Sequence, residues 1–198
     1  MEKFYELFRR NLKTPRLELR ILEPTLENAK LVWNVIKDED HANFRFVRWS
    51  PNYKKPLPES IEETLETMEQ EQKYDVNPNG VVWYVFYNGK LIGHHGVFYF
   101  DNNKSMQGGN VWFVKSAWGQ GFNHEIHDML AKMAFEELGA NRILRQCMAN
   151  NERSQKSIMG SGFHLDGRIR ATTYMPDGTW SDQLVFTKLA TEYGKKTI

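Results

Sequence analysis

The sequence predicts an α/β (α+β) protein, in which a mixed β-sheet carries helices on its faces. Segments whose apolar residues alternate, as in strands, are interspersed with segments whose apolar residues recur every three or four positions, as in helices. The dipeptide Asn88-Gly89 joins two apolar segments and is typical of a two-residue hairpin turn. The chain has 198 residues, 40% of them hydrophobic, which suits a single domain over residues 1–198.

The first quarter of the chain predicts a strand between two helices. Residues 1–11 form an N-terminal extension with helical spacing, which we expect to pack on the domain or on a second copy in a homodimer. Apolar residues alternate from Arg16 to Leu22, and Pro24-Thr25 then opens a helix. The aromatic loop that follows (residues 43–53) is equally consistent with a hydrophobic lid and with a partner surface.

The middle of the chain is predominantly β. Ser60 and Glu63 form a capping-box pair at the start of a second helix. After it we expect two hairpin strands, a turn, a third strand, a helix ended by Gly139 and a fourth strand. In chain order these segments are Val81 to Tyr87, Lys90 to Phe100, Asp101 to Gly108, Gly109 to Lys115, His124 to Leu138 and Arg142 to Met148.

The last quarter predicts a short helix and a closing hairpin. The helix runs from Ser154 to Gly160, and the hairpin strands are Arg168 to Tyr174 and Gln183 to Leu189. They are joined across Pro176-Asp177-Gly178, a combination favoured in turns. The resulting element order is β-α-α-β-β-β-α-β-α-β-β.

Composition excludes several classes of function. The single cysteine, Cys147, rules out an intrachain disulfide and a cysteine-rich zinc site, and we expect no metal. A formal net charge of +1 argues against binding nucleic acid through general attraction. The longest apolar run, Val81 to Tyr87, is far shorter than the roughly 20 residues that span a bilayer. Because the first ten residues also lack a signal sequence, we expect a cytoplasmic protein without membrane association.

Two segments carry candidate chemistry. In the first, a strand leads through Gly119-Gln120-Gly121 into a helix, and the unpaired N–H groups of a helix start favour an anion such as a pyrophosphate. Two glycines so close together are also common in turns that bind nothing. In the second, Asn151 precedes Ser154 by three residues, which is the spacing of a helix N-cap. A residue that caps a helix can also face a ligand.

From Leu12 to Leu189 the chain resembles the GCN5-related N-acetyltransferase (GNAT) family, in the branch of the bacterial RimJ/RimL ribosomal-protein N-terminal acetyltransferases. The resemblance rests on the order and spacing of short motifs over about nine-tenths of the sequence. They are Thr14-Pro15-Arg16-Leu17-Glu18-Leu19-Arg20, Leu91-Ile92-Gly93, Trp118-Gly119-Gln120-Gly121-Phe122, Glu137-Leu138-Gly139-Ala140, Asn151 with Ser154, Gly162-Phe163 and Gly178 with Asp182.

The resemblance implies a mostly antiparallel sheet splayed in the middle, with helices on both faces, and an acetyl-CoA site. The strand Trp112-Phe113-Val114 would bond the pantetheine arm through its backbone. Asn151 would reach the pantetheine, and Ser154 would be the catalytic general acid beside the thioester sulfur. The N–H groups after the strand would hold the pyrophosphate, namely those of Trp118, Gly119, Gln120, Gly121, Phe122, Asn123 and His124.

The general base is not evident from the sequence. Where relatives of this branch carry a glutamate proposed as base, this chain has Ala171-Thr172-Thr173. His94 or His95 could take the role, since histidine titrates near neutral pH and adjacent strand residues point to opposite faces. The alternative is that one of them is solvated and the other lies in the core.

The predicted activity is direct transfer of the acetyl group of acetyl-CoA to a primary amine. An α-amine loses its proton more easily than lysine, so a protein N-terminal α-amine is the favoured acceptor. One alternative is an acetyltransferase for a small amine such as an antibiotic, a nucleotide conjugate or a polyamine. The other is a non-catalytic module that binds acyl-CoA.

Overall fold

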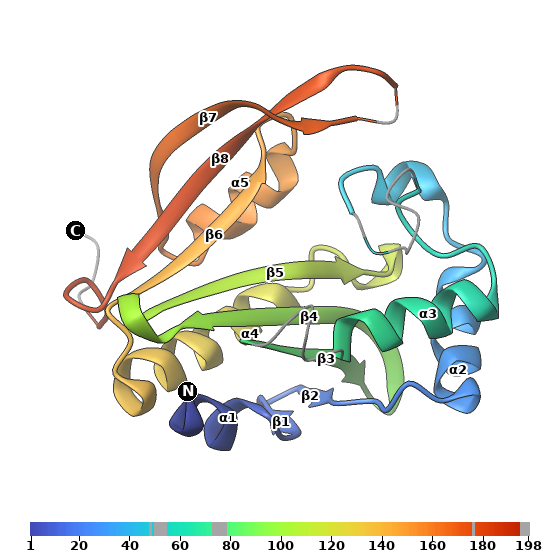
Figure 1. Cartoon of the computed structure of the whole chain (residues 1–198), viewed down its shortest axis with the longest axis horizontal. Helices are drawn as coiled ribbons and strands as arrows, with labels where there is room; N and C mark the ends of the chain where they lie inside the picture. Colours follow the sequence, from blue (N-terminus) through green and yellow to red (C-terminus); the bar gives the residue numbers. More distant parts are fainter. Residues whose placement is uncertain (48, 50–54, 73–78, 176, 195–198) are drawn as a thin grey trace. The chain divides into compact units, whose positions relative to one another are not determined.

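A computed structural model describes residues 1–47, 49, 55–72, 79–175 and 177–194, and the strands of this part form one sheet (Figure 1). They are β1 (Leu12–Lys13), β2 (Leu17–Arg20), β3 (Gly80–Tyr87), β4 (Lys90–Phe100), β5 (Ser105–Phe113), β6 (Arg142–Met148), β7 (His164–Tyr174) and β8 (Trp180–Leu189). Their order is β1-β2-β3-β4-β5-β6-β8-β7. β5 pairs in parallel with β6, whereas β1–β2, β2–β3, β3–β4, β6–β8 and β7–β8 are antiparallel. The predicted mixed, mostly antiparallel sheet is confirmed.

The chain divides into two compact units. Unit 1 consists of Met1–Leu7, Tyr99–Gly109 and the residues from Asn123 onward. Unit 2 consists of Phe8–Phe98 and Asn110–Phe122. The strands β4 and β5 each contribute residues to both units.

Two helices of unit 2 begin where the sequence predicts. Helix α2 (Leu26–Ile36) is capped by Thr25, whose side chain accepts a hydrogen bond from the N–H of Asn28 at 3.2 Å. Before helix α3 (Ile61–Gln72), the Ser60 hydroxyl accepts from the N–H of Glu63 at 3.0 Å, which confirms half of the capping box. The Glu63 carboxylate instead accepts from the N–H of Glu59, one residue earlier than the motif requires.

Between these helices lies a short 3₁₀ helix, η1 (His41–Phe44), in which Phe44 is buried. Residues 48 and 50–53 of the aromatic loop lie outside the described residues, so its role as lid or partner surface stays a prediction.

The hairpin between β3 and β4 has the predicted turn. Asn88 (φ 49°) and Gly89 (φ 75°) both occupy the left-handed region, as a type I′ turn requires. β4 is buried along most of its length, from Leu91 to Val97. The hairpin therefore forms the centre of the core of unit 2.

The connection before β5 is shorter than predicted. The turn consists of the 3₁₀ helix η2 (Asp101–Asn103) and Lys104 (φ 46°), and β5 already begins at Ser105. The prediction of a turn up to Gly108 was therefore wrong. At the other end, Lys115 does not extend the strand but begins a 3₁₀ turn, η3 (Lys115–Ala117).

The helix after the glycine loop has two parts. Helix α4 (Phe122–Lys132) continues as a π-helix, η4 (Met133–Leu138), and Gly139 (φ 76°) ends it as predicted. Helix α5 (Glu152–Gly160) begins two residues earlier than predicted, directly after its N-cap Asn151.

The closing hairpin is longer than the alternation of apolar residues suggested, because β7 starts at His164 and β8 at Trp180. Pro176 of the predicted turn lies outside the described residues. Around it, the N–H of Gly178 bonds the carbonyl of Met175 at 3.0 Å, and Met175 in turn donates to Thr179 at 2.8 Å.

Helix α1 (Glu2–Phe8) packs on its own chain. In unit 1 the ring of Phe4 stacks on Tyr99 with centroids 5.4 Å apart, and in unit 2 Phe8 contacts Trp83 at 6.4 Å. Phe4 and Phe8 are fully buried. Packing on the domain, the first of the two predicted alternatives, is confirmed, and the homodimer stays a prediction.

Candidate functional site

The glycine loop of unit 2 follows β5 and has a defined backbone. Gly119 (φ 73°) and Gly121 (φ 77°) both lie in the left-handed region that side chains rarely adopt. A Cβ on Gly119 would meet no atom within 4 Å, and one on Gly121 would meet only the guanidinium of Arg16 at 3.6 Å. The glycines are therefore required by backbone conformation, and Gly119 leaves its surface open for a ligand to approach.

Arg16, which the sequence analysis did not assign to the site, holds this loop. Its Nη1 donates to the carbonyl of Gln120 at 3.1 Å, and its guanidinium lies 4.7 Å from the centre of the Phe122 ring. Since these partners are more than 100 residues away in sequence, no local pattern could have indicated the contact. The loop thus has a fixed positive charge beside its exposed main-chain amides.

The end of β5 offers backbone groups on one edge only. The N–H of Val114 donates to Ile92 of β4 at 2.9 Å, so the backbone of Val114 is directed toward β4. Because successive residues of a strand alternate, the N–H and carbonyl of Phe113 point away from β4. The Trp118 indole donates to the Phe113 carbonyl at 2.8 Å from that side. Phe113 is therefore the residue of the predicted Trp112–Val114 segment whose backbone groups face away from β4.

A buried carboxylate–imidazole pair lies under the same strand. His94 Nδ1 is 2.6 Å from the carbonyl of Asn110, and His94 Nε2 is 3.1 Å from a carboxylate oxygen of Glu71. The His94 side chain is 0% exposed and that of Glu71 is 8% exposed. The Trp49 indole donates to the other carboxylate oxygen at 2.8 Å. The pair thus connects α3 to the β5 residue Asn110, whose φ is 51°.

Aromatic rings enclose this pair. His94 stacks on Trp112 with centroids 6.0 Å apart and planes at 7°, and Tyr84 contacts His94 edge-on at 5.1 Å. Burial, together with the charge of Glu71, raises the pKa of Tyr84 well above its usual value. Within the described ranges, the Tyr84 hydroxyl and the Trp112 indole N–H are buried without a hydrogen-bond partner.

The prediction for the two histidines was wrong in one respect. Neither His94 nor His95 is solvated, since both are 0% exposed. His94 pairs with Tyr84 across the β3–β4 ladder and His95 pairs with Trp83. Both faces of β4 are covered, which alternation along the strand alone does not reveal.

In unit 1, the first side chains of α4 are bonded to α5. Asn123 Nδ2 donates to the Ser157 hydroxyl at 2.9 Å, and His124 Nδ1 lies 3.0 Å from the Ser161 hydroxyl. The backbone N–H groups of Asn123 and His124 lie in the first turn of the helix, where they are unpaired and can bond a phosphate. The His124 side chain is 49% exposed, and its Nε2 lies 3.9 Å from Asp128.

Asn151 and Ser154 meet as predicted for a helix cap. The Asn151 side-chain oxygen accepts from the N–H of Ser154 at 3.1 Å. Ser154 is half-buried, and its hydroxyl hydrogen-bonds the thiol of Cys147 on β6. Burial raises the pKa of that thiol, with the Ser154 hydrogen bond acting weakly in the opposite direction. Cys147 is thus poorly suited to be a nucleophile.

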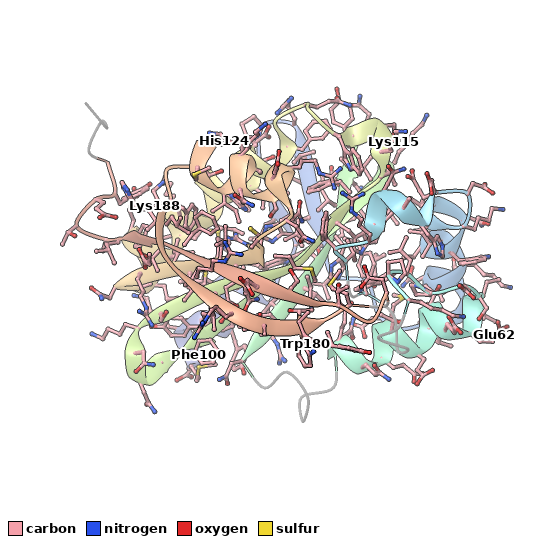
Figure 2. All side chains as sticks on the ribbon, turned by 90° about the horizontal axis from the view of Figure 1, so that it is seen from above. Glu62, Phe100, Lys115, His124, Trp180 and Lys188 are labelled. Atoms are coloured by element: carbon pink, nitrogen blue, oxygen red, sulfur yellow. The ribbon has the colours of Figure 1, made fainter. Side chains whose placement is uncertain are left out.

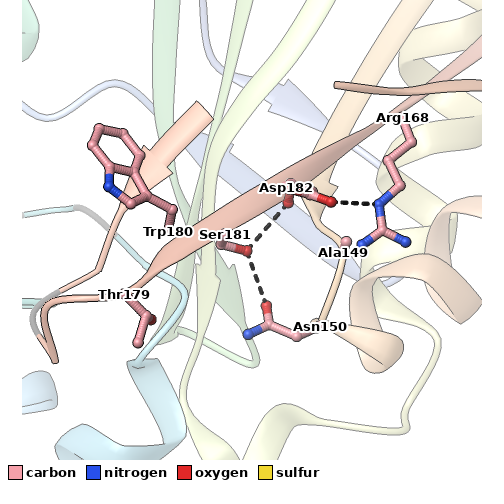
Figure 3. Close-up of a pocket in the computed structure, with 7 residues that line it drawn as sticks. All are labelled: Ala149, Asn150, Arg168, Thr179, Trp180, Ser181 and Asp182. Carbon is pink, nitrogen blue, oxygen red and sulfur yellow. Dashed lines mark hydrogen bonds and ion pairs between the residues drawn. The ribbon is translucent and has the colours of Figure 1, made fainter. Parts of the chain in front are cut away.

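A hollow of about 250 Å³ opens beside this cap, where β6 ends against the closing hairpin (Figure 3). It is lined by Ala149, Asn150, Arg168, Thr179, Trp180, Ser181 and Asp182. Asp182 accepts from the N–H of Ala171 at 2.8 Å and from Arg168 Nε at 2.6 Å. These two hydrogen bonds lower its pKa. Trp180, labelled in Figure 2, is 62% exposed at the rim of the hollow. Its ring contacts that of Tyr174, with the ring centroids 5.2 Å apart.

The sequence matches the acetyltransferase (GNAT) domain family over residues 16–164, well over half of the chain. The chain belongs to the GNAT acetyltransferase family. It is therefore an acetyl-CoA-dependent N-acetyltransferase. The predicted family, fold class, enzyme class and cosubstrate are confirmed.

Solved acetyltransferase structures share the fold. A GCN5-related N-acetyltransferase from Brucella melitensis has a TM-score of 0.78 at 16% identity, over 93% of this chain and 80% of that one. RimL, the ribosomal L7/L12 alpha-N-protein acetyltransferase, in complex with coenzyme A, has a TM-score of 0.72 at 18% identity, over 90% and 97%. The structure of MccE, the microcin C7 self-immunity acetyltransferase, in complex with acetyl-CoA and AMP has a TM-score of 0.72 at 19% identity. The match covers 88% of this chain and 93% of that one. No curated protein matches the sequence.

The residues of this acetyltransferase fit its cosubstrate. The open surface above Gly119 and the main-chain amides up to Phe122 suit a diphosphate, and Arg16 adds a positive charge. In the part of the chain described, no three His, Cys, Asp or Glu side chains gather as metal ligands would. Nor does that part contain a helix long and apolar enough to cross a bilayer.

Proposed function

We propose that this acetyltransferase transfers the acetyl group to the N-terminal α-amine of a protein of the ribosomal type. The observation that carries the proposal is the lack of an acidic side chain at Ala171, Thr172 and Thr173 of β7. At pH 7 it costs about 1 kcal/mol to deprotonate an α-amine and about 5 kcal/mol to deprotonate a lysine. An enzyme without a strong base is therefore suited to the α-amine.

The hydrogen bonds of His94 support this choice. A carbonyl can only accept, so Nδ1, which faces Asn110, carries a proton. The contact between Nε2 and the Glu71 carboxylate also requires a proton between its two atoms. Both ring nitrogens of His94 are therefore engaged, Nδ1 by the Asn110 carbonyl and Nε2 by Glu71. His94 therefore holds β5 in place and does not serve as the general base.

For the cosubstrate, we place the diphosphate on the N–H groups from Gly119 to His124, because the N–H of Trp118 already donates to the Lys115 carbonyl at 3.1 Å. The pantetheine arm bonds the backbone of Trp112–Val114, chiefly that of Phe113. Support comes from the left-handed backbone of Gly119 and Gly121 and from the outward-facing backbone of Phe113. The cosubstrate supplies the thioester carbonyl that the amine attacks.

Ser154 is the proposed general acid. When the carbon–sulfur bond breaks, the electron pair stays on sulfur, and the Ser154 hydroxyl donates the proton that converts the thiolate into a thiol. The proton that the amine nitrogen loses as the amide forms then restores the Ser154 hydroxyl. Its backbone is fixed by Asn151, and its hydroxyl already hydrogen-bonds one sulfur atom, that of Cys147. We also assign Asn151 to the pantetheine.

A small amine is the second candidate acceptor. RimL, which shares this fold, is a ribosomal L7/L12 alpha-N-protein acetyltransferase, whereas MccE, which also shares it, is a microcin C7 self-immunity acetyltransferase. The exposed ring pair of Tyr174 and Trp180 favours the second candidate, because it offers a stacking surface beside a polar hollow.

Labelled acetyl-CoA and three matched acceptors test the proposal: a peptide with a free α-amine and no lysine, its N-blocked counterpart with one lysine, and a spermidine-type polyamine. We expect turnover with the first. The pH at which kcat/KM levels off should follow the amine's own pKa when the N-terminal residue is changed. Faster turnover of the blocked lysine peptide, or of the polyamine, would contradict the proposed acceptor.

A further inference from the structure

Arg145, in the middle of β6, is a buried cation with no counter-charge among the residues that the structure describes. It is 4% exposed. Across the described ranges its guanidinium forms no ion pair, and its buried Nε has no hydrogen-bond partner. Burial alone lowers its pKa to about 9, so the side chain is still charged at neutral pH. An isolated buried charge strongly opposes folding, and proteins usually supply a partner for one.

The guanidinium of Arg145 occupies the space beside Gly108 of the neighbouring strand β5. A Cβ on Gly108 of β5 would lie 1.6 Å from Arg145 Nη1 and 1.9 Å from Cζ. No other residue type fits at position 108 while the arginine keeps this position. Arg145 comes directly after Leu144, the β6 residue that pairs with Gln107 of β5. Two neighbouring strands therefore fix the guanidinium.

Arg145 lies on the same face of β6 as Cys147, the residue that contacts the proposed general acid Ser154. Residues two apart on a strand point to the same side, about 7 Å apart, so Arg145 and Cys147 lie on one face of β6. The Cys147 thiol hydrogen-bonds Ser154. The unpaired cation thus lies on the same side of β6 as the group that we assign to the departing sulfur.

We propose that Arg145 binds a carboxylate of a substrate, which supplies the missing counter-charge. The inference rests on the proposed function and refines its substrate class. A carboxylate matches the planar fork of a guanidinium through two parallel hydrogen bonds. The carboxylate can belong to the acyl donor, as in a succinyl or malonyl thioester, or to the acceptor, as in an amino acid or a peptide with a free C-terminus.

The first test measures thermal unfolding without any substrate. Arg145→Met keeps an unbranched side chain as far as the position of Nε and removes the guanidinium charge, so the variant should unfold at the same temperature as the wild type or a higher one. Arg142→Met is the control, because Arg142 is on the same strand but donates to the Ser105 hydroxyl at 3.1 Å. A clear drop for Arg145→Met alone would show that the guanidinium already has a stabilising partner, and would overturn the proposal.

The second test compares each carboxylate ligand with its neutral counterpart. In the donor arm, succinyl-CoA is compared with butyryl-CoA; in the acceptor arm, a peptide with a free C-terminus is compared with its amide. Wild type and Arg142→Met should prefer the carboxylate in one arm by roughly 10- to 100-fold in kcat/KM or Kd, the range of a charged hydrogen bond. In Arg145→Met and Arg145→Lys the ratio should fall, to about one for Met and to an intermediate value for Lys.

The arm that shows the preference identifies the source of the carboxylate. A wild type without preference in either arm, or a preference that survives in Arg145→Met, would overturn the inference while leaving acetyl transfer intact. Absence of acetyl-CoA binding and of turnover with every acceptor would instead overturn the proposed function, and the unfolding experiment would still test the missing counter-charge.

Discussion

Replacing Gly119 by alanine separates backbone conformation from ligand approach at the glycine loop. An alanine in the left-handed region costs about 1–2 kcal/mol, and at Gly119 the new Cβ would touch nothing within 4 Å. Gly89 in the β3–β4 turn is a matched control, because its φ of 75° is close to the 73° of Gly119 and its Cβ would also meet open space. Both variants should therefore lose the same stability, which corresponds to about 2–8 °C in Tm for a chain of this size.

Only Gly119→Ala should lose affinity for acetyl-CoA. Its Cβ would occupy the surface where the diphosphate meets the main-chain amides, and losing one charge-assisted hydrogen bond there weakens binding by roughly tenfold or more. Isothermal titration calorimetry with wild type, Gly89→Ala and Gly119→Ala measures this directly. If Gly119→Ala binds acetyl-CoA like Gly89→Ala while unfolding at the same temperature, the diphosphate does not lie on this loop.

Four further predictions follow from single residues. Ser154→Ala should lower kcat by about tenfold or more with little change in acetyl-CoA Kd, and equal kcat in steady-state assays would remove its role as acid. Arg16→Ala should weaken acetyl-CoA binding more at low salt than at high salt, as calorimetry at two ionic strengths would show. Glu71→Ala should destabilise the protein by about 3–5 kcal/mol in urea unfolding, because it leaves His94 buried without its partner. The lowered pKa of Asp182 means that its stabilising effect is present above about pH 4 and lost as the pH falls further; Asp182→Asn should flatten that part of the stability profile.

Much of the fold could be predicted because its signals are local. The Asn88-Gly89 turn depends on two adjacent residues that tolerate positive φ, and the Thr25 and Asn151 caps depend on hydrogen bonds to residues three positions on. The glycine loop is local in the same sense, since Gly119 and Gly121 are needed for their own backbone angles. Such features can be read from a few consecutive residues.

The start of β5 was mispredicted because a glycine can be required by a side chain that is distant in sequence and not by a turn. Gly108 suggested a turn, but it lies within a strand and is glycine because the guanidinium of Arg145 occupies the space where its Cβ would be. The two residues are 37 positions apart, so only the pairing of β5 with β6 reveals the reason. The π-helical segment from Met133 to Leu138 had no signal in the apolar spacing, which fits a continuous α-helix equally well.

The same distinction explains which parts of the site the sequence missed. The predicted residues belong to continuous motifs, whereas Arg16, Glu71 and Arg145 act through contacts that bring distant segments together. Each of these three residues carries a formal charge, and in each case the fold determines what the charge can do. Arg16 is fixed on a loop, Glu71 is committed to His94, and Arg145 is left without a partner among the described residues.

The charged residues described above bear on which group could remove the proton of the acceptor amine. The Glu71–His94 pair already contains the proton that its geometry requires, and Asp182 is a weak base because two hydrogen bonds stabilise its charged form. With its lowered pKa, Asp182 cannot efficiently take a proton from an ammonium ion of high pKa, and both ring nitrogens of His94 are engaged by Asn110 and Glu71. A large fraction of the acceptor amine must therefore already be unprotonated at the working pH. In our proposal, Arg145 binds substrate and does not transfer protons. A weakly basic amine on a molecule that carries a carboxylate satisfies both conditions at once, and a peptide with a free α-amine and a free C-terminus is the simplest acceptor of that kind.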